Sequence, residues 1–182
     1  YKQDSEGEGM NPAEIIPPQK REPSKAYLVN KLRSAVYTWR KQGYPGATDT
    51  TRRLLKYWFN EDHIISDKLF QFWYCQREAI ETLIYVYEVM KMRHFSDMGR
   101  EFGTGKVLNY NPSNDLYPLF GFKMATGSGK TYVMALTIVW QYFNYKKENK
   151  NDYSSKYLII TGGRNVIYDR LKKDYEGGKI FF

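Results

Sequence analysis

The sequence predicts an α/β fold with a parallel sheet, preceded by a helical region. An apolar run at residues 119–125 leads through a glycine-containing turn into a stretch at residues 130–146 that is apolar on most faces of a helix, as expected for a helix packed on a sheet. A second apolar run, residues 157–161, is short and continuous, which is typical of a strand in a parallel sheet. A strand, a crossover helix and a second strand indicate a βαβ unit.

The N-terminal half of the chain predicts helices. Residues 1–23 are polar and interrupted by prolines, so we expect an irregular tail. Apolar residues then recur at helical spacing in three stretches: residues 25–42, a stretch that follows Thr48 or Thr50 and runs to about residue 60, and residues 75–92. Ser24 is the expected N-cap of the first helix, and either Thr48 or Thr50 that of the second.

Glycines and polar residues at 97–116 predict a loop, and residues 165–175 predict a last helix. The expected organisation is a tail at 1–23, a helical region at 24–96, the loop at 97–116 and the α/β part at 117–182. The chain starts at Tyr1 and ends inside an apolar run, so we expect it to be part of a longer protein.

The turn between the first strand and its helix has the composition of a phosphate cradle. Gly127 and Gly129 permit backbone conformations and close approaches that a Cβ would block. Lys130 can reach the β- and γ-phosphates, and the Thr131 hydroxyl is suited to Mg²⁺. Backbone N–H groups and the N-terminus of the following helix favour an anion. The candidate residues that bind the phosphates are Thr126, Gly127, Ser128, Gly129, Lys130 and Thr131.

The strict phosphate-loop pattern places a glycine at position 124, where this chain has Met124. An ordinary turn between a strand and a helix is the alternative. That alternative does not explain why two glycines, a lysine and a threonine follow one another in phosphate-loop order. The sequence therefore predicts a site for a nucleoside triphosphate.

Charge and cysteine content restrict the partners and the compartment. The net charge of +8 favours an anionic partner such as nucleic acid, although a basic surface that only maintains solubility is the alternative. A single cysteine excludes an internal disulfide. No stretch reaches the roughly 20 apolar residues of a membrane span, so we expect no membrane partner and a cytoplasmic location.

Four stretches in order, residues 43–55, 72–84, 123–131 and 157–171, resemble a known family. They are similar to the N-terminal part of a superfamily 2 helicase-type ATPase with DEAD/DEAH-box relatives, and most of all to the restriction (Res) subunit of type III restriction enzymes. The resemblance covers residues 25–182. It implies a partial RecA-like P-loop motor lobe with a parallel sheet and an α-helical N-terminal extension.

The resemblance also implies residue roles. Gln76 corresponds to the glutamine that reads adenine, with Phe72 or Tyr74 as a stacking partner, and Lys130 to the catalytic lysine of the phosphate loop. ATP and Mg²⁺ are the implied cofactors. Double-stranded DNA is the implied substrate, and a modification subunit or another defence-system subunit is the implied partner. The implied nucleic-acid contacts are Thr161, Gly162, Gly163 and Arg164.

One stretch departs from the family pattern, and one family motif is missing from the sequence. Gly162 and Gly163 stand where the family usually has a proline after the contact residue. No Asp-Glu dipeptide, the pair that holds Mg²⁺ and polarises water in the family, occurs in the sequence. We therefore expect the chain alone to bind a nucleotide without hydrolysing it. The alternatives are an RNA helicase of the same superfamily, a nucleotide-dependent binding module without motor activity, and a small-molecule kinase.

Overall fold

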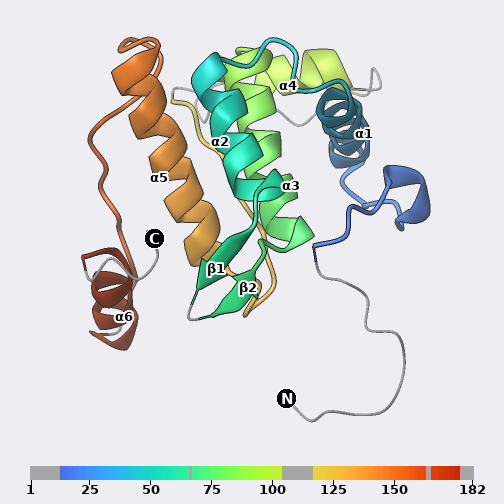
Figure 1. Ribbon diagram of the computed structural model, residues 1–182. Helices are drawn as coiled ribbons and strands as arrows, with labels where there is room; N and C mark the ends of the chain where they lie inside the picture. The colour runs from blue at the N-terminus through green and yellow to red at the C-terminus, as the bar shows by residue number, and fades with distance from the viewer. Residues whose placement is uncertain (1–12, 66, 104–116, 163–164, 177–182) are drawn as a thin grey trace, which may run out of the picture.

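The computed structural model describes residues 13–65, 67–103, 117–162 and 165–176. Helices dominate this part of the chain (Figure 1). The helices are η1 (Pro18–Lys20), α1 (Tyr27–Lys41), α2 (Asp49–Asn60), α3 (Tyr74–Ile84), the π-helical turn η2 (Tyr85–Val89), α4 (Phe95–Phe102), α5 (Lys130–Lys147) and α6 (Asn165–Tyr175). The strands are β1 (His63–Ile65) and β2 (Lys68–Phe70).

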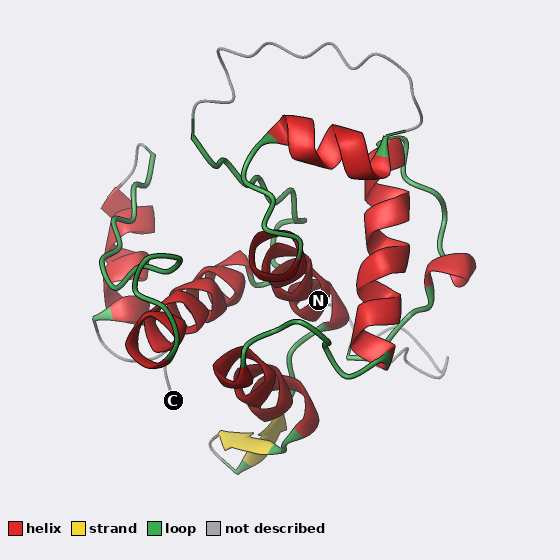
Figure 2. Ribbon diagram, turned by 90° about the horizontal axis from the view of Figure 1, so that it is seen from above, coloured by secondary structure: helices red, strands yellow, loops and turns green. Residues whose placement is uncertain are grey.

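The core lies where α2, α3 and α5 pack together, with α1 against α3 and α4 against α1. Figure 2 shows the same helices from above, with the small hairpin at one edge. Leu55, Ile80, Ile84 and Trp140 are almost completely buried in this core. Because these side chains come from three helices far apart in sequence, the apolar stripes of the N-terminal helices hold α5 in place.

A buried ionic cluster joins α1 to α3. The Glu81 carboxylate accepts hydrogen bonds from Arg40, from Arg77 at 2.9 Å and from the Tyr44 hydroxyl at 2.7 Å. Burial and the Glu81 charge raise the pKa of Tyr44 to about 12, so its hydroxyl stays a donor at neutral pH. A buried carboxylate is tolerated only when it is paired and hydrogen-bonded, and these three donors satisfy that requirement.

A second buried carboxylate, Glu88 on η2, joins α2 to α5. It accepts hydrogen bonds from the Thr48 backbone N–H at 2.6 Å, from the Thr51 hydroxyl at 2.7 Å and from the Trp140 indole N–H at 2.9 Å. Asn144 extends this cluster, because its side chain bonds to the hydroxyls of Thr48 and Thr51. We call these five residues the Glu88 cluster. The cluster fixes the C-terminal half of α5 to the N-terminal helices.

The predicted parallel sheet is absent from the described residues. Residues 119–125 and 157–161 have no strand partner there, and the described sheet is an antiparallel hairpin that pairs His63 with Phe70. Leu158 and Ile160 are each 85% exposed. A strand needs a neighbour to satisfy its backbone N–H and C=O groups, and apolar character alone does not supply one.

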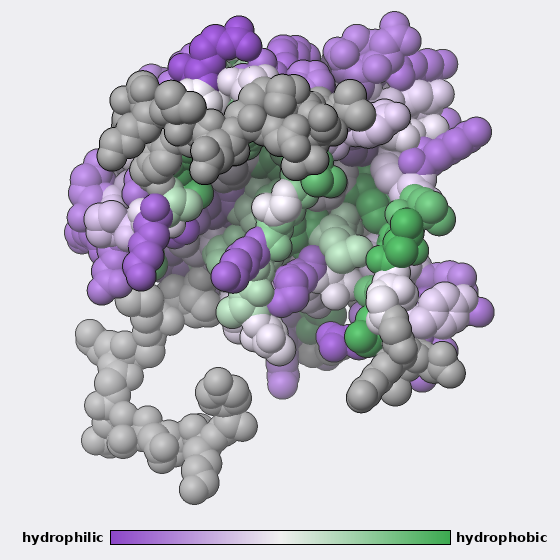
Figure 3. Space-filling model, turned by 180° about the vertical axis from the view of Figure 1, so that it is seen from behind, coloured by the Kyte–Doolittle hydropathy of each residue, from purple (hydrophilic) through white to green (hydrophobic). Residues whose placement is uncertain are grey.

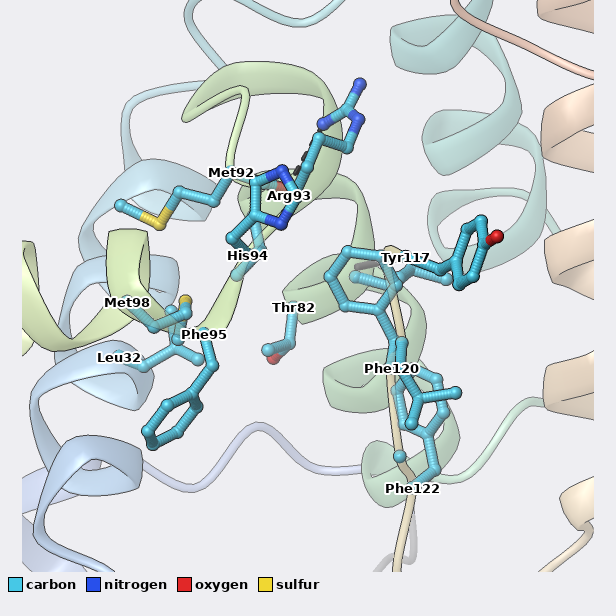
Figure 4. Close-up of a pocket in the computed structure, with 14 residues that line it drawn as sticks. Leu32, Thr82, Met92, Arg93, His94, Phe95, Met98, Tyr117, Phe120 and Phe122 are labelled. Carbon is cyan, nitrogen blue, oxygen red and sulfur yellow. Dashed lines mark hydrogen bonds between the residues drawn. The ribbon is translucent and has the colours of Figure 1, made fainter. Parts of the chain in front are cut away.

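Large apolar side chains of both segments are exposed, among them Leu119, Phe122 and Ile160. Figure 3 shows one face of the molecule, on which apolar surface gathers near the middle and hydrophilic surface lies mostly at the rim. Below residues 117–122, a cavity of about 450 Å³ is bounded by α1, α3 and α4 and is lined by apolar side chains such as Phe95, Met98, Phe120 and Phe122 (Figure 4). No residue of the glycine turn lines this cavity.

Several local predictions have clear outcomes. Thr48 is the N-cap of α2, since its side chain accepts a hydrogen bond from the Thr51 N–H. The prediction of Ser24 as a cap was wrong: α1 begins at Tyr27 without a side-chain cap, and the Asn30 side chain bonds the backbone of Ser24. The bounds of the helix predicted at 165–175 are confirmed.

The first part of the predicted loop at 97–116 is helix α4 instead. Asp97 accepts hydrogen bonds from the backbone N–H groups of Arg93 and His94, which lower the pKa of Asp97 and satisfy the start of the helix. Residues 104–116 lie outside the described chain. Part of the predicted tail packs against the helices, because Arg21 forms a bidentate ion pair with Glu78 on α3.

Candidate nucleotide-binding site

The glycine turn lies at the N-terminus of α5, as the sequence predicts. Gly127 and Gly129 have φ angles of +81° and +78°, in the left-handed region that disfavours a side chain. A Cβ at Gly127 would meet nothing within 4 Å, so the space beside this residue is open. A Cβ at Gly129 would lie 2.1 Å from Nε2 of Gln76, so a side chain there would displace the Gln76 amide, in addition to the strain of the positive φ.

Ser128 closes the turn. Its backbone N–H and its Oγ donate to the carbonyl oxygen of Ala125 at 3.3 and 2.7 Å. The side chain is therefore engaged within the turn and is not presented as a nucleophile. Thr126 and Gly127 at the tip are exposed.

Lys130 and Thr131 follow in the first turn of α5. The Lys130 ammonium donates to the carbonyl oxygens of Met124 and Ala125 at 3.0 and 2.7 Å, which keeps its charge over the turn. The first N–H groups of a helix have no partner within it, and the helix dipole adds partial positive charge at this end. These donors, the open space beside Gly127 and the exposed ammonium fit a phosphate group.

Gln76 on α3 lies against the turn. Its Nε2 donates to the carbonyl oxygen of Ser128 at 3.0 Å, and its Oε1 accepts the N–H of Trp73 at 3.0 Å. Gln76 is only 5% exposed. The structure thus brings the predicted adenine-reading residue to the phosphate turn, although the adenine contact itself stays a prediction. Nothing in the sequence signals the bond to Ser128.

The predicted stacking partners are packed inside the protein. Phe72 is buried and makes edge-to-face contacts with Phe59, Phe70 and Tyr132, with ring centroids 5.0–6.0 Å apart. Tyr74 is buried and donates to the carbonyl oxygen of Ile16. Neither ring presents an open face to a base in this arrangement.

The predicted nucleic-acid residues are separate from the turn. Thr161 is half-buried and Gly162 is exposed, and no hydrogen bond joins either of them to the turn within the described chain. Gly163 and Arg164 lie outside the described residues. One contact between α6 and the start of α5 was not predicted. The hydroxyl of Tyr175, at the end of α6, donates to the carbonyl oxygen of Thr131 at 3.1 Å.

Two further observations concern metals and membranes. In the part of the chain that the structure describes, no group of three or more His, Cys, Asp or Glu residues is arranged to hold a metal ion. A single Thr131 hydroxyl suits a Mg²⁺ ion whose remaining ligands are phosphate oxygens and water. No described helix combines the length and the apolar character needed to cross a membrane.

Comparison with known proteins identifies a family for the chain. A family model described as type III restriction enzyme, res subunit, matches residues 69–178, which is more than half of the chain and includes α3, the glycine turn, α5 and α6. No curated protein and no solved structure matches the chain.

Proposed function

Because the chain belongs to the family of type III restriction enzyme res subunits, an ATP-dependent motor family of helicase superfamily 2, we propose that it is the ATP-binding part of a DNA translocase or helicase. The proposed motor acts in a restriction or phage-defence system. Its partners are double-stranded DNA and a modification or other defence-system subunit. The net charge of +8 suits a polyanionic substrate.

The glycine turn at the N-terminus of α5 is the observation that carries this proposal. Gly127 and Gly129 take conformations that disfavour a side chain, Lys130 holds its charge over the turn, and the first N–H groups of α5 point out of the helix end. These are the parts that a triphosphate needs, and they occur together within residues 125–131.

Each residue has a proposed task. Lys130 leaves the carbonyl oxygens of the turn and binds the β- and γ-phosphates, and the N–H groups of the turn bind the phosphate oxygens between them. Thr131 provides a hydroxyl ligand to Mg²⁺, which when bound neutralises charge on the phosphates. Gln76 reads the adenine edge with its amide and holds the turn through Ser128.

Hydrolysis requires groups beyond those in this sequence. The chain contains no Asp-Glu pair, which would position water and help to hold Mg²⁺. We propose that the 182-residue chain binds Mg·ATP without turning it over. Residues 161–164 hold the nucleic-acid backbone in this proposal.

ATP hydrolysis by the intact protein tests the proposal. The rate is measured without nucleic acid, with double-stranded DNA and with RNA of equal length at fixed salt, because phosphate contacts make binding salt-dependent. We expect the rate to rise with DNA. Stimulation by RNA alone would indicate an RNA helicase, since only RNA offers the 2′-hydroxyl. Nucleotide binding without hydrolysis on any polymer would contradict the motor and indicate a nucleotide-dependent binding module.

A further inference from the structure

A second cavity, of about 450 Å³, lies between α2 and α5. Figure 1 shows these two helices side by side, with the β1–β2 hairpin next to them. Trp58, Phe72 and Leu136 form the buried part of its wall, with at most 8% of each residue exposed. The volume lies within the range of about 300–1,000 Å³ that is usual for ligand pockets. We call this cavity and its rim the α2–α5 groove.

The wall of the groove is mostly aromatic. Six of the ten described residues that line it carry an aromatic ring, and none of the ten is Lys, Arg, Asp or Glu. Aromatic rings attract one another in stacked and edge-to-face arrangements, and a wall without charged groups does not compensate for the desolvation of a charged ligand. The chemistry of the wall therefore suits a flat, uncharged ring.

Two exposed rings line the groove, Tyr57 from α2 at 46% exposure and Phe143 from α5 at 43%. Both rings are held by neighbours. The Tyr57 ring lies edge-to-face against His63, with centroids 4.7 Å apart, and His63 Nε2 donates to the backbone carbonyl oxygen of Tyr57 at 2.7 Å. The Phe143 ring lies edge-to-face against Tyr142, with centroids 5.6 Å apart. Rings that are already held lose little conformational entropy when another ring stacks on them.

A cation lies one helical turn from each exposed ring. Arg53 on α2 and Lys147 on α5 are each four residues from the exposed ring of their own helix, a spacing that makes side chains neighbours on a helix surface. Both are exposed, and neither forms an ion pair within the described chain. The Glu148 carboxylate accepts from the backbone N–H and the hydroxyl of Thr50, which brings the start of α2 to the end of α5. Both cations therefore lie at the same end of the groove.

We propose that the α2–α5 groove binds single-stranded DNA. One unpaired base enters the cavity against Tyr57 and Phe143, and the adjoining phosphates contact Arg53 and Lys147. Stacking rings beside cations hold single strands without reading their sequence, because every base has a flat face and every nucleotide a phosphate. The cation end of the groove is distinct from the nucleotide site, since Lys147 lies about 26 Å along α5 from Lys130 at about 1.5 Å per residue. The groove goes beyond the proposed function, to which it adds a separate contact with unpaired DNA.

The affinity of the intact protein for fluorescein-labelled oligothymidylate, measured by anisotropy without nucleotide, tests the groove. An abasic strand of the same length provides the same phosphates without bases. We expect Tyr57→Ala and Phe143→Ala each to weaken binding of oligothymidylate about 5-fold or more, because each removes a stacking ring. Both variants should bind the abasic strand within about twofold of the unaltered protein. Lys147→Ala should weaken binding of both strands and lower the slope of log affinity against log salt concentration by about 0.7, the loss of one phosphate contact.

Tyr117→Ala is the matched control, because Tyr117 is 79% exposed and does not line the groove. This variant should bind both strands as the unaltered protein does, and equal melting temperatures establish that every variant is folded. If Tyr57→Ala and Phe143→Ala both bound oligothymidylate like the unaltered protein, the groove would not be a DNA site. Displacement of the strand by free adenosine would also overturn the proposal and assign the cavity to a small molecule. Neither result bears on the proposed function, which is tested by nucleotide hydrolysis.

Discussion

Lys130→Ala is expected to lower the rate of DNA-stimulated ATP hydrolysis by the intact protein about 10²-fold or more. The Lys130 ammonium lies over the glycine turn, held by the carbonyl oxygens of Met124 and Ala125. In the proposed motor, Lys130 stabilises the transferring phosphoryl group, and losing one such preorganised donor typically costs 10² to 10³ in rate. The helix keeps its fold, because Lys130 is exposed and alanine is the best helix former.

The control for this variant is Lys146→Ala, the same substitution on an exposed lysine near the other end of α5. It changes the net charge equally but leaves the turn intact, so hydrolysis should stay within about twofold of the unaltered rate. Steady-state kinetics at several ATP concentrations separate binding from turnover. Unchanged hydrolysis by Lys130→Ala would place the phosphate site elsewhere.

Glu88→Ala is expected to lower the free energy of unfolding by about 3–5 kcal/mol. Glu88 is 2% exposed and accepts from Thr48, Thr51 and Trp140. Alanine leaves these buried donors without their acceptor, and each unsatisfied donor costs about 1–3 kcal/mol. Glu88→Gln keeps the volume and one acceptor oxygen, so its loss should be smaller. Urea denaturation of the chain, with unchanged m-value, measures both losses.

Glu61→Ala is the matched surface control. Glu61 is exposed at the end of α2, and its substitution should change the free energy of unfolding by no more than about 0.5 kcal/mol. If Glu88→Ala were as mild as Glu61→Ala, the Glu88 cluster would not be what holds α5 to the N-terminal helices. The cluster would then have no part in keeping the glycine turn beside α3.

Local sequence signals predicted the elements that depend on local physics. Helix α5 begins at Lys130 because Gly129, with its positive φ, ends the turn and apolar residues then continue at helical spacing. Thr48 caps α2 through its own side chain. In each case the interactions involved span four residues or fewer, which is the range that periodicity and capping rules describe.

The predictions that failed, or were never made, depend on partners far along the chain. Residues 157–161 have the composition of a strand, but a strand exists only when another strand pairs with it. The contacts of Gln76 with Ser128 and of Tyr175 with Thr131 join residues 52 and 44 positions apart. Glu88 appears in the sequence as one more charged residue in a helical stretch, and only the packing of α2 against α5 buries it.

The most direct test of the phosphate site is a titration of the isotopically labelled chain with Mg·ADP, followed by the chemical shifts of its backbone amides. We expect the N–H signals of Gly127, Gly129 and Thr131 to shift together with one dissociation constant. The amides of Gly43 and Gly46, glycines with the same positive φ between α1 and α2, should not move. Shifts confined to another part of the chain, or no shifts at millimolar nucleotide, would contradict a nucleotide site at the start of α5.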